Sequence, residues 1–188
     1  MGTSRNDRSP STPPWKIALA VLGTPDVPPD RQCTEIWRAV AADRGEKMLR
    51  DFSHPSLAEA CRLASARISP QEAVARFDAI TSEATAPGFT FDMGRRAIAR
   101  CAAESSGSSG FVSELFSEAV SYYASRDLPS YVGATGRIQN STESIQLKEL
   151  LRRVTKIKVE SAGSPRSATR EWRGYIARVL RALQGGAQ

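Results

Sequence analysis

The feature that most constrains the fold of this chain is a helical spacing of apolar residues that recurs almost from end to end. Cys33, Ile36, Trp37 and Val40, for example, lie three or four positions apart, which places them on one face of a helix. No convincing alternation of apolar and polar residues appears. Only the segment 157–160 could be extended, and nothing near it would pair with it. The sequence therefore predicts an all-α fold, an irregular bundle of seven or eight helices.

Prolines and glycines mark where these helices begin and end. Ser69, Pro70 and Glu72 form a strong start signal, with a cap, a proline at the first helical position and an acid at the third. Ser56 and Glu59 predict a capping box. Gly45 predicts a break, with a further short helical piece after it. The expected helices begin near residues 30, 56, 69, 92, 111, 143 and 165, and the run 15–22 is a short helix or a strand.

Charge is distributed unevenly along the chain. Residues 1–136 contain 15 Lys or Arg and 16 Asp or Glu, a net charge of −1, whereas residues 137–188 contain 11 and 4, a net charge of +7. Residues 1–14 have no apolar side chain after Met1, so we expect a disordered tail there. We therefore expect three parts: the tail 1–14, a near-neutral helical body at 15–136, and a basic helix pair at 137–188 packed on the same domain.

Both C-terminal helices separate apolar residues from cations. Leu147, Leu151 and Val154 follow one face of the first, and Trp172 and Val179 follow one arc of the second. Cations presented outward would neutralise phosphates of a nucleic-acid backbone. The candidate nucleic-acid-binding residues are Lys148, Arg152, Lys156, Arg166, Arg170, Arg173 and Arg181. Two alternatives remain open, a solvated charged face and a surface for an acidic protein partner.

The segment 122–137 contains three of the four tyrosines, two glycines and two arginines. Loops of this composition on a helical scaffold often carry recognition residues. The candidates for recognition in this loop are Arg126, Asp127, Tyr131 and Arg137. The simpler interpretation is a plain connection, in which Arg126 pairs with an acid and the glycines shape the turn.

Several chemistries are disfavoured by the residues present. His54 is the only histidine, and its position before Pro55 suits a helix cap better than a general base. A nucleophilic serine or cysteine would need this same histidine. We find no phosphate-cradling loop, and metal ligation would rest on carboxylates such as Asp26 and Asp30 alone. We therefore expect no enzymatic activity, no cofactor and no metal.

The cysteines and the hydropathy pattern bear on the environment of the chain. Cys33, Cys61 and Cys101 are widely spaced and fall among apolar neighbours, which indicates buried free thiols in a reducing compartment. No apolar run approaches the roughly 20 residues that span a bilayer. We therefore expect a cytoplasmic protein without a membrane partner.

Two functions lead from the sequence, and an enzyme that uses the loop from Arg126 to Arg137 is a third possibility behind them. The first is a non-enzymatic accessory protein that binds nucleic acid, or another polyanion, through its C-terminal basic helices without reading sequence. The second is an interaction adaptor or a subunit of a larger complex. An adaptor would expose Trp37, Tyr131 or Trp172 within an apolar patch, whereas the first function requires only accessible cations.

Overall fold

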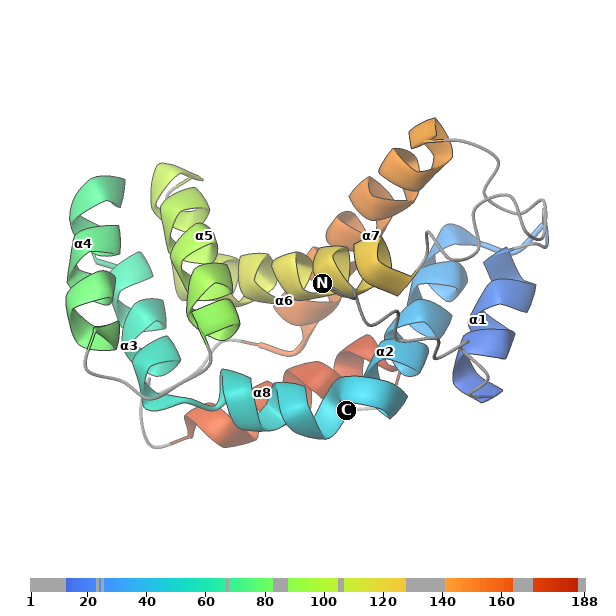
Figure 1. The fold of residues 1–188 in the computed structure, drawn as a ribbon, viewed down its shortest axis with the longest axis horizontal. Coiled ribbons are helices and arrows are strands. Elements are labelled where there is room, and N and C mark those ends of the chain that lie inside the picture. The colour runs from blue at the N-terminus through green and yellow to red at the C-terminus, as the bar shows by residue number, and fades with distance from the viewer. Residues whose placement is uncertain are drawn as a thin grey trace, which may run out of the picture.

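The computed structural model describes residues 13–22, 24, 26–66, 68–82, 88–104, 107–127, 141–163 and 171–185. All regular structure in these residues is helical, which confirms the all-α prediction (Figure 1). These residues form eight helices: α1 (Pro13–Leu22), α2 (Pro29–Phe52), α3 (Pro55–Ala64), α4 (Pro70–Thr81), α5 (Gly88–Glu104), α6 (Gly107–Asp127), α7 (Ser141–Ser161) and α8 (Trp172–Leu183). The run 15–22 and the segment 157–160 are both helical.

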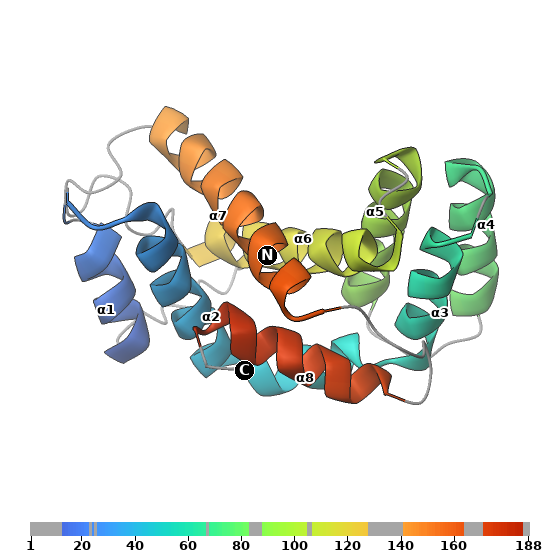
Figure 2. The ribbon, with the colours of Figure 1, turned by 180° about the vertical axis from the view of Figure 1, so that it is seen from behind.

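The helix α6 lies at the centre of the arrangement. It packs against α5 on one side and α7 on the other, and it also contacts α3 and α2. Helices α3, α4 and α5 form one end of the molecule, and α1 lies at the opposite end against α2 (Figure 1). From behind, α7 and α8 both lie on the near side (Figure 2), with α8 packed along α2.

Aromatic side chains fill the core where α2 and α6 meet. Trp37 and Phe116 are fully buried, and their ring centroids lie 6.1 Å apart. Phe52 meets Phe116 edge to face at 5.2 Å, a geometry that such rings prefer. The three cysteines are buried and none of them forms a disulfide, as expected.

The N-termini of α3 and α4 show which of the predicted helix caps are present in the structure. Ser69 caps α4, because its hydroxyl accepts a hydrogen bond from the Glu72 amide at 3.2 Å. The expected capping box at Ser56 is wrong. His54 caps α3 instead, with its Nδ1 atom accepting from the Ser56 amide at 3.2 Å. Pro55 takes the first helical position, where its missing amide costs nothing, so the helix begins one residue earlier than expected.

Helix ends also differ from the expectations. The helix α2 runs through Gly45 without a break, because the apolar spacing continues to Met48 and Phe52 on the buried face. The helix α5 begins at Gly88 rather than Asp92, and α6 begins at Gly107 rather than near 111. Gly107 has a φ of 67°, which suits glycine and lets the chain reverse between α5 and α6.

Four hydrogen bonds attach the C-terminal helices to α2. The indole nitrogen of Trp37 donates to the Thr155 hydroxyl at 2.9 Å, and Lys158 donates to the Thr34 hydroxyl at 2.8 Å. The Trp172 indole donates to the carbonyl of Phe52 at 2.7 Å, and Arg38 Nε donates to the carbonyl of Gln184 at 2.8 Å. The basic helices are therefore docked on the first third of the chain.

Candidate polyanion interface

The cations of α8 lie on the side of the helix that faces away from its partners. Trp172, Tyr175 and Val179 are buried, whereas Arg173 and Arg181 are exposed. Arg178, at the edge of the expected arc, is also exposed, and its guanidinium lies 5.6 Å from the centre of the Tyr175 ring. This contact is a cation–π interaction that holds one end of the basic arc against the core.

The cations predicted on α7 form one stripe at spacings of four residues. Lys148, Arg152 and Lys156 are all partly exposed, and they flank the face that carries the buried Leu151 and Val154. Arg152 is not free, because its Nη2 atom lies 3.0 Å from Glu114 Oε2 on α6. The stripe therefore borders α6, and its middle member already has a carboxylate partner.

The same carboxylates bind arginines from α5 on the other side of α6. Arg100 Nη1 lies 2.5 Å from Glu118 Oε1 and 3.4 Å from Glu114 Oε2. Arg96 Nη1 lies 3.6 Å from Glu118 Oε2. We call this cluster the guanidinium ridge, made of Arg96, Arg100 and Arg152 around Glu114 and Glu118. It joins three helices through one row of charges.

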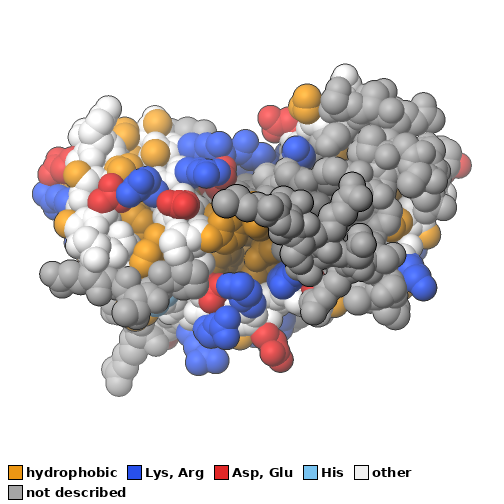
Figure 3. Space-filling model, in the orientation of Figure 1, with side chains coloured by type: hydrophobic (Ala, Val, Ile, Leu, Met, Phe, Trp, Pro, Cys, Tyr) orange, Lys and Arg blue, Asp and Glu red, His pale blue; other side chains and the backbone are white. Residues whose placement is uncertain are grey.

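Burial gives the guanidinium ridge a cationic outer surface. The side chains of Glu114 and Glu118 are only 12% and 11% exposed, whereas those of Arg96, Arg100 and Arg152 are 66%, 41% and 32% exposed. The carboxylates thus lie beneath the guanidinium groups. Figure 3 shows Lys and Arg side chains gathered between α5 and α7, over α6. Solvent here meets mostly guanidinium groups.

The sequence predictions missed Arg96 and Arg100, which lie outside the basic segment 137–188. One signal was present, since Arg96 and Arg100 on α5, like Glu114 and Glu118 on α6, are four residues apart. Two adjacent helices with matching i, i+4 charges of opposite sign can pair along their length. The pairing became evident only with the antiparallel packing of α5 and α6.

The cations of α2 to α5 and those of α7 and α8 differ in how many of them have an ion-pair partner. Of the ten cations on α2 to α5, all except Arg31 have a described carboxylate within ion-pairing distance. These nine are Arg38, Arg44, Lys47, Arg50, Arg62, Arg76, Arg95, Arg96 and Arg100. Of the eight cations described on α7 and α8, only Arg152 has such a partner among the described residues. The other seven have none there: Lys148, Arg153, Lys156, Lys158, which donates to the Thr34 hydroxyl instead, Arg173, Arg178 and Arg181.

Several candidate residues fall outside the part of the chain that the structure describes. They are Arg166, Arg170, Tyr131 and Arg137. Arg126 and Asp127 form the end of α6, but their side chains are outside the described set. The helix α6 therefore continues into the segment that the sequence assigned to a loop.

Within the part of the chain that the structure describes, the histidine and the cysteines considered for catalysis lie in a helix cap and in the core. His54 uses its Nδ1 atom as a helix cap and meets the Phe91 ring edge to face at 5.3 Å. Burial, with Asp30 adding to it, raises the pKa of Cys33 to about 12, and burial, with Cys101 adding to it, raises that of Cys61 to about 12. Both thiols therefore stay protonated and unreactive near neutral pH. Among the described residues, no three His, Cys, Asp or Glu side chains are grouped to hold a metal ion.

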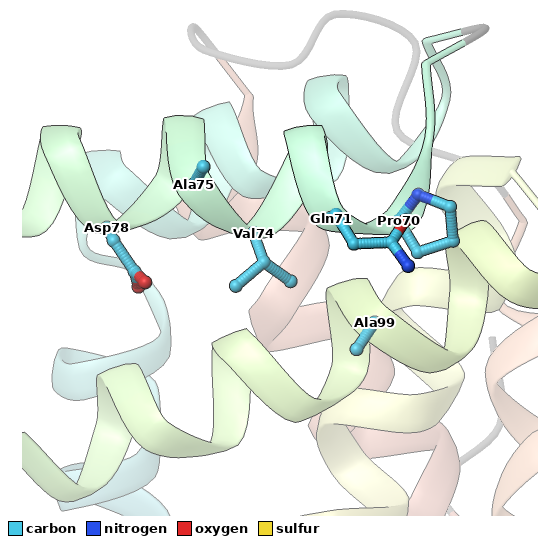
Figure 4. A pocket seen from close by; sticks show the side chains of 6 residues that line it. All are labelled: Pro70, Gln71, Val74, Ala75, Asp78 and Ala99. Atoms are coloured by element: carbon cyan, nitrogen blue, oxygen red, sulfur yellow. The ribbon is translucent and has the colours of Figure 1, made fainter.

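A shallow cavity of about 420 Å³ lies between α4 and α5. Val74, Gln71 and Asp78 point from α4 toward α5, whose Ala99 lies on the opposite wall (Figure 4). Asp78 is the only titratable residue of the lining, and Arg95 holds it at 2.7 Å. The cavity is largely apolar and offers no acid–base pair.

Comparison with known proteins adds no assignment, because no family model, curated protein or solved structure matches the chain. No helix in the described part of the chain is both long enough and apolar enough to cross a bilayer. Trp37 and Trp172 are buried at 0% and 2% exposure, so neither supplies the exposed aromatic that an adaptor was expected to show. Tyr131 lies outside the described residues.

Proposed function

We propose that the chain is a non-enzymatic protein that binds the phosphate backbone of nucleic acid, or a similar polyanion, through α7 and α8. The observation that carries the proposal is the difference in ion pairing between these helices and the body. Arg173, Arg178 and Arg181 are exposed and have no carboxylate partner among the described residues. Arg153 and Lys156 extend this set on α7.

Unpaired cations favour binding for a physical reason. An arginine that already has a carboxylate partner must lose or share that partner when a phosphate arrives. An unpaired arginine exchanges only water and a loosely held counterion, and the released counterions from the nucleic acid add to the affinity. Each exposed arginine of α8 therefore offers more to a polyanion than a paired arginine of the body.

A protein partner is the second candidate, because Ile145 and Ile157 on α7 are 62% and 60% exposed. These side chains lie twelve residues apart and do not form one continuous patch with the buried tryptophans. They would suit the edge of a protein contact better than its centre. We therefore place this candidate after the polyanion.

A salt titration of binding distinguishes these functions. We expect the wild-type chain to bind DNA or RNA at low ionic strength, with log K falling linearly as log salt rises. The triple variant Arg173→Gln, Arg178→Gln, Arg181→Gln should reduce that slope by roughly 2 to 3, which corresponds to the loss of about three phosphate contacts.

The matched control removes the same charge from paired arginines of the body, Arg50→Gln, Arg62→Gln and Arg76→Gln. This control should leave the slope nearly unchanged, although the net charge is the same in both variants. Equal losses in the two triple variants would show that net charge alone governs binding. An absence of salt-dependent binding, with discrete proteins captured instead, would favour the adaptor.

A further inference from the structure

An exposed pair of aromatic rings lies at one end of the guanidinium ridge. The rings of Phe89 on α5 and Tyr122 on α6 have centroids 4.1 Å apart and are 37% and 42% exposed. Tyr123, largely buried, supports Tyr122 from behind, with centroids 5.3 Å apart at an interplanar angle of 75°. A pair of packed rings that stays this exposed presents a fixed π surface to solvent.

The helical registers align this pair with the guanidinium ridge. Phe89, Arg96 and Arg100 fall at positions i, i+7 and i+11 of α5, which share one stripe. Tyr122 and Glu118 are likewise one turn apart on α6. The contacts Phe89–Tyr122 and Arg96–Glu118 are successive rungs between two antiparallel helices. The rings and the guanidinium groups therefore lie on one continuous strip of surface.

We propose that this strip binds single-stranded nucleic acid, with a base stacked on Phe89 or Tyr122 and neighbouring phosphates on the guanidinium ridge. The three exposed arginines of the ridge outnumber its two carboxylates, so a phosphate would share these arginines with Glu114 and Glu118. From Phe89 to Arg96 the axis of α5 rises by about 10 Å, a length that two or three nucleotides of a strand span. Aromatic rings beside a positively charged groove are the recurring way in which proteins hold single strands without reading sequence. The inference rests on the proposed function, whose partner it narrows from any polyanion to a single strand.

The chemistry of the strip favours nucleic acid over an acidic peptide or a duplex. An acidic peptide supplies carboxylates for the guanidinium groups but has no obligatory planar group to place on the rings. A duplex supplies phosphates, but its bases are already stacked on each other. Only an unpaired strand offers both a planar base and a phosphate at each residue.

Lys148 extends the cationic side of the strip on α7, one turn before Arg152. Asp92 is the acid of α5 closest in sequence to Phe89. It is exposed and lies one turn from both Phe89 and Arg96, at i+3 and i−4 respectively, so it borders the strip on the side of Ala99, toward α4. The strip is therefore cationic on the α7 side, whereas Asp92 is an exposed acid on its α4 side.

The test compares a short oligothymidylate with an abasic oligomer that has the same number of phosphates. We expect the full-length chain to bind oligothymidylate about tenfold more tightly, the contribution of a stacked base. The variant Phe89→Leu, Tyr122→Leu keeps apolar bulk but has no aromatic face. It should lose this preference while it keeps the affinity for the abasic oligomer. Tyr122→Phe, the conservative control, should retain the preference, and circular dichroism verifies the helical content of each variant.

The possible results separate this inference from the proposed function. Equal binding of oligothymidylate and abasic oligomer would overturn stacking but leave backbone binding intact. Tighter binding of duplex DNA, or equal competition by polyglutamate, would overturn the single-strand assignment and identify a duplex or an acidic protein as the partner. If neither oligomer bound at low salt, the proposed function itself would fail together with the inference.

Discussion

Replacing Glu114 with Gln should lower the stability of the protein and raise its affinity for a polyanion. Glu114 is nearly buried and accepts contacts from Arg152 at 3.0 Å and Arg100 at 3.4 Å. Glutamine keeps the volume but removes the charge that these guanidinium groups share. The two guanidinium groups would remain on the surface and become available to an incoming phosphate.

The size of each effect follows from this geometry. Charge-assisted hydrogen bonds are about twice as strong as neutral ones, and the arginines are 41% and 32% exposed. After allowance for screening by solvent, we expect a loss of about 1 kcal/mol, or a melting temperature lower by roughly 2 to 4 °C. For a phosphate about 8 Å away, removing one negative charge gains about 0.5 to 1 kcal/mol at low salt, which is about a two- to fivefold gain in affinity.

Thermal denaturation and fluorescence anisotropy with a labelled oligonucleotide measure the two effects on the same sample. The matched control is Glu72→Gln on α4, whose partner Arg76 and own side chain are both about half exposed. Glu72→Gln should leave both quantities nearly unchanged, because α4 lies at the far end of the molecule from α7 (Figure 1). Weaker binding by Glu114→Gln, or an unchanged melting temperature, would refute the view that buried carboxylates hold an outward cationic surface.

Three further predictions concern stability. Gly94→Ala should destabilise the protein by about 1 to 2 kcal/mol in urea denaturation, because an added Cβ would lie 2.8 Å from Leu57 Cδ2 and 3.0 Å from Phe77 Cζ. Gly174→Ala, with open space around it, should instead stabilise the protein by about 0.5 to 1 kcal/mol. A change of the same sign in both variants would contradict this reasoning. Trp37→Phe should lower the free energy of unfolding by about 2 to 3 kcal/mol, since it leaves the buried Thr155 hydroxyl without its donor. Adding Thr155→Val to this variant should cost little more stability. Additive losses from the two substitutions would argue against a hydrogen bond between Trp37 and Thr155. The pKa of Cys61, raised to about 12, keeps this thiol neutral in the folded protein while the thiol of the unfolded chain ionises. The free energy of unfolding should therefore fall between about pH 9 and 12 by up to about 1.4 kcal/mol per pH unit. Cys61→Ala should flatten this pH dependence, and an unchanged slope would show that Cys61 does not cause it.

Local rules predicted much of the fold but not the choice of partners between helices. The Ser69 cap and the buried face of α8 follow from spacing alone, and both are present. The continuity of α2 does not follow from spacing alone. The helix continues through Gly45 because burial of Met48 and Phe52 stabilises its second half. At α3, the histidine before the proline competes successfully with the serine after it for the capping position.

The candidate site was predictable only in part, because some of its features belong to one helix and others depend on which helices pack together. The outward arc of α8 is a property of one helix, so Arg173 and Arg181 could be found from the sequence. The guanidinium ridge requires knowing that α5 and α7 flank α6, which depends on packing between distant segments. The stacked pair of Phe89 and Tyr122 is hidden in the same way, since each residue alone resembles an ordinary apolar helix position.

The bond between Trp37 and Thr155 has a consequence for how the chain is made. Its two partners are 118 residues apart, so a ribosome that adds about 5 to 20 residues per second needs roughly 6 to 24 s to produce the second after the first. During that time the apolar face of α2 lacks both α7 and α8. A chaperone that shields apolar helices could bind this face throughout that time, and the newly made protein could not bind through α7 and α8 until both helices had emerged from the ribosome.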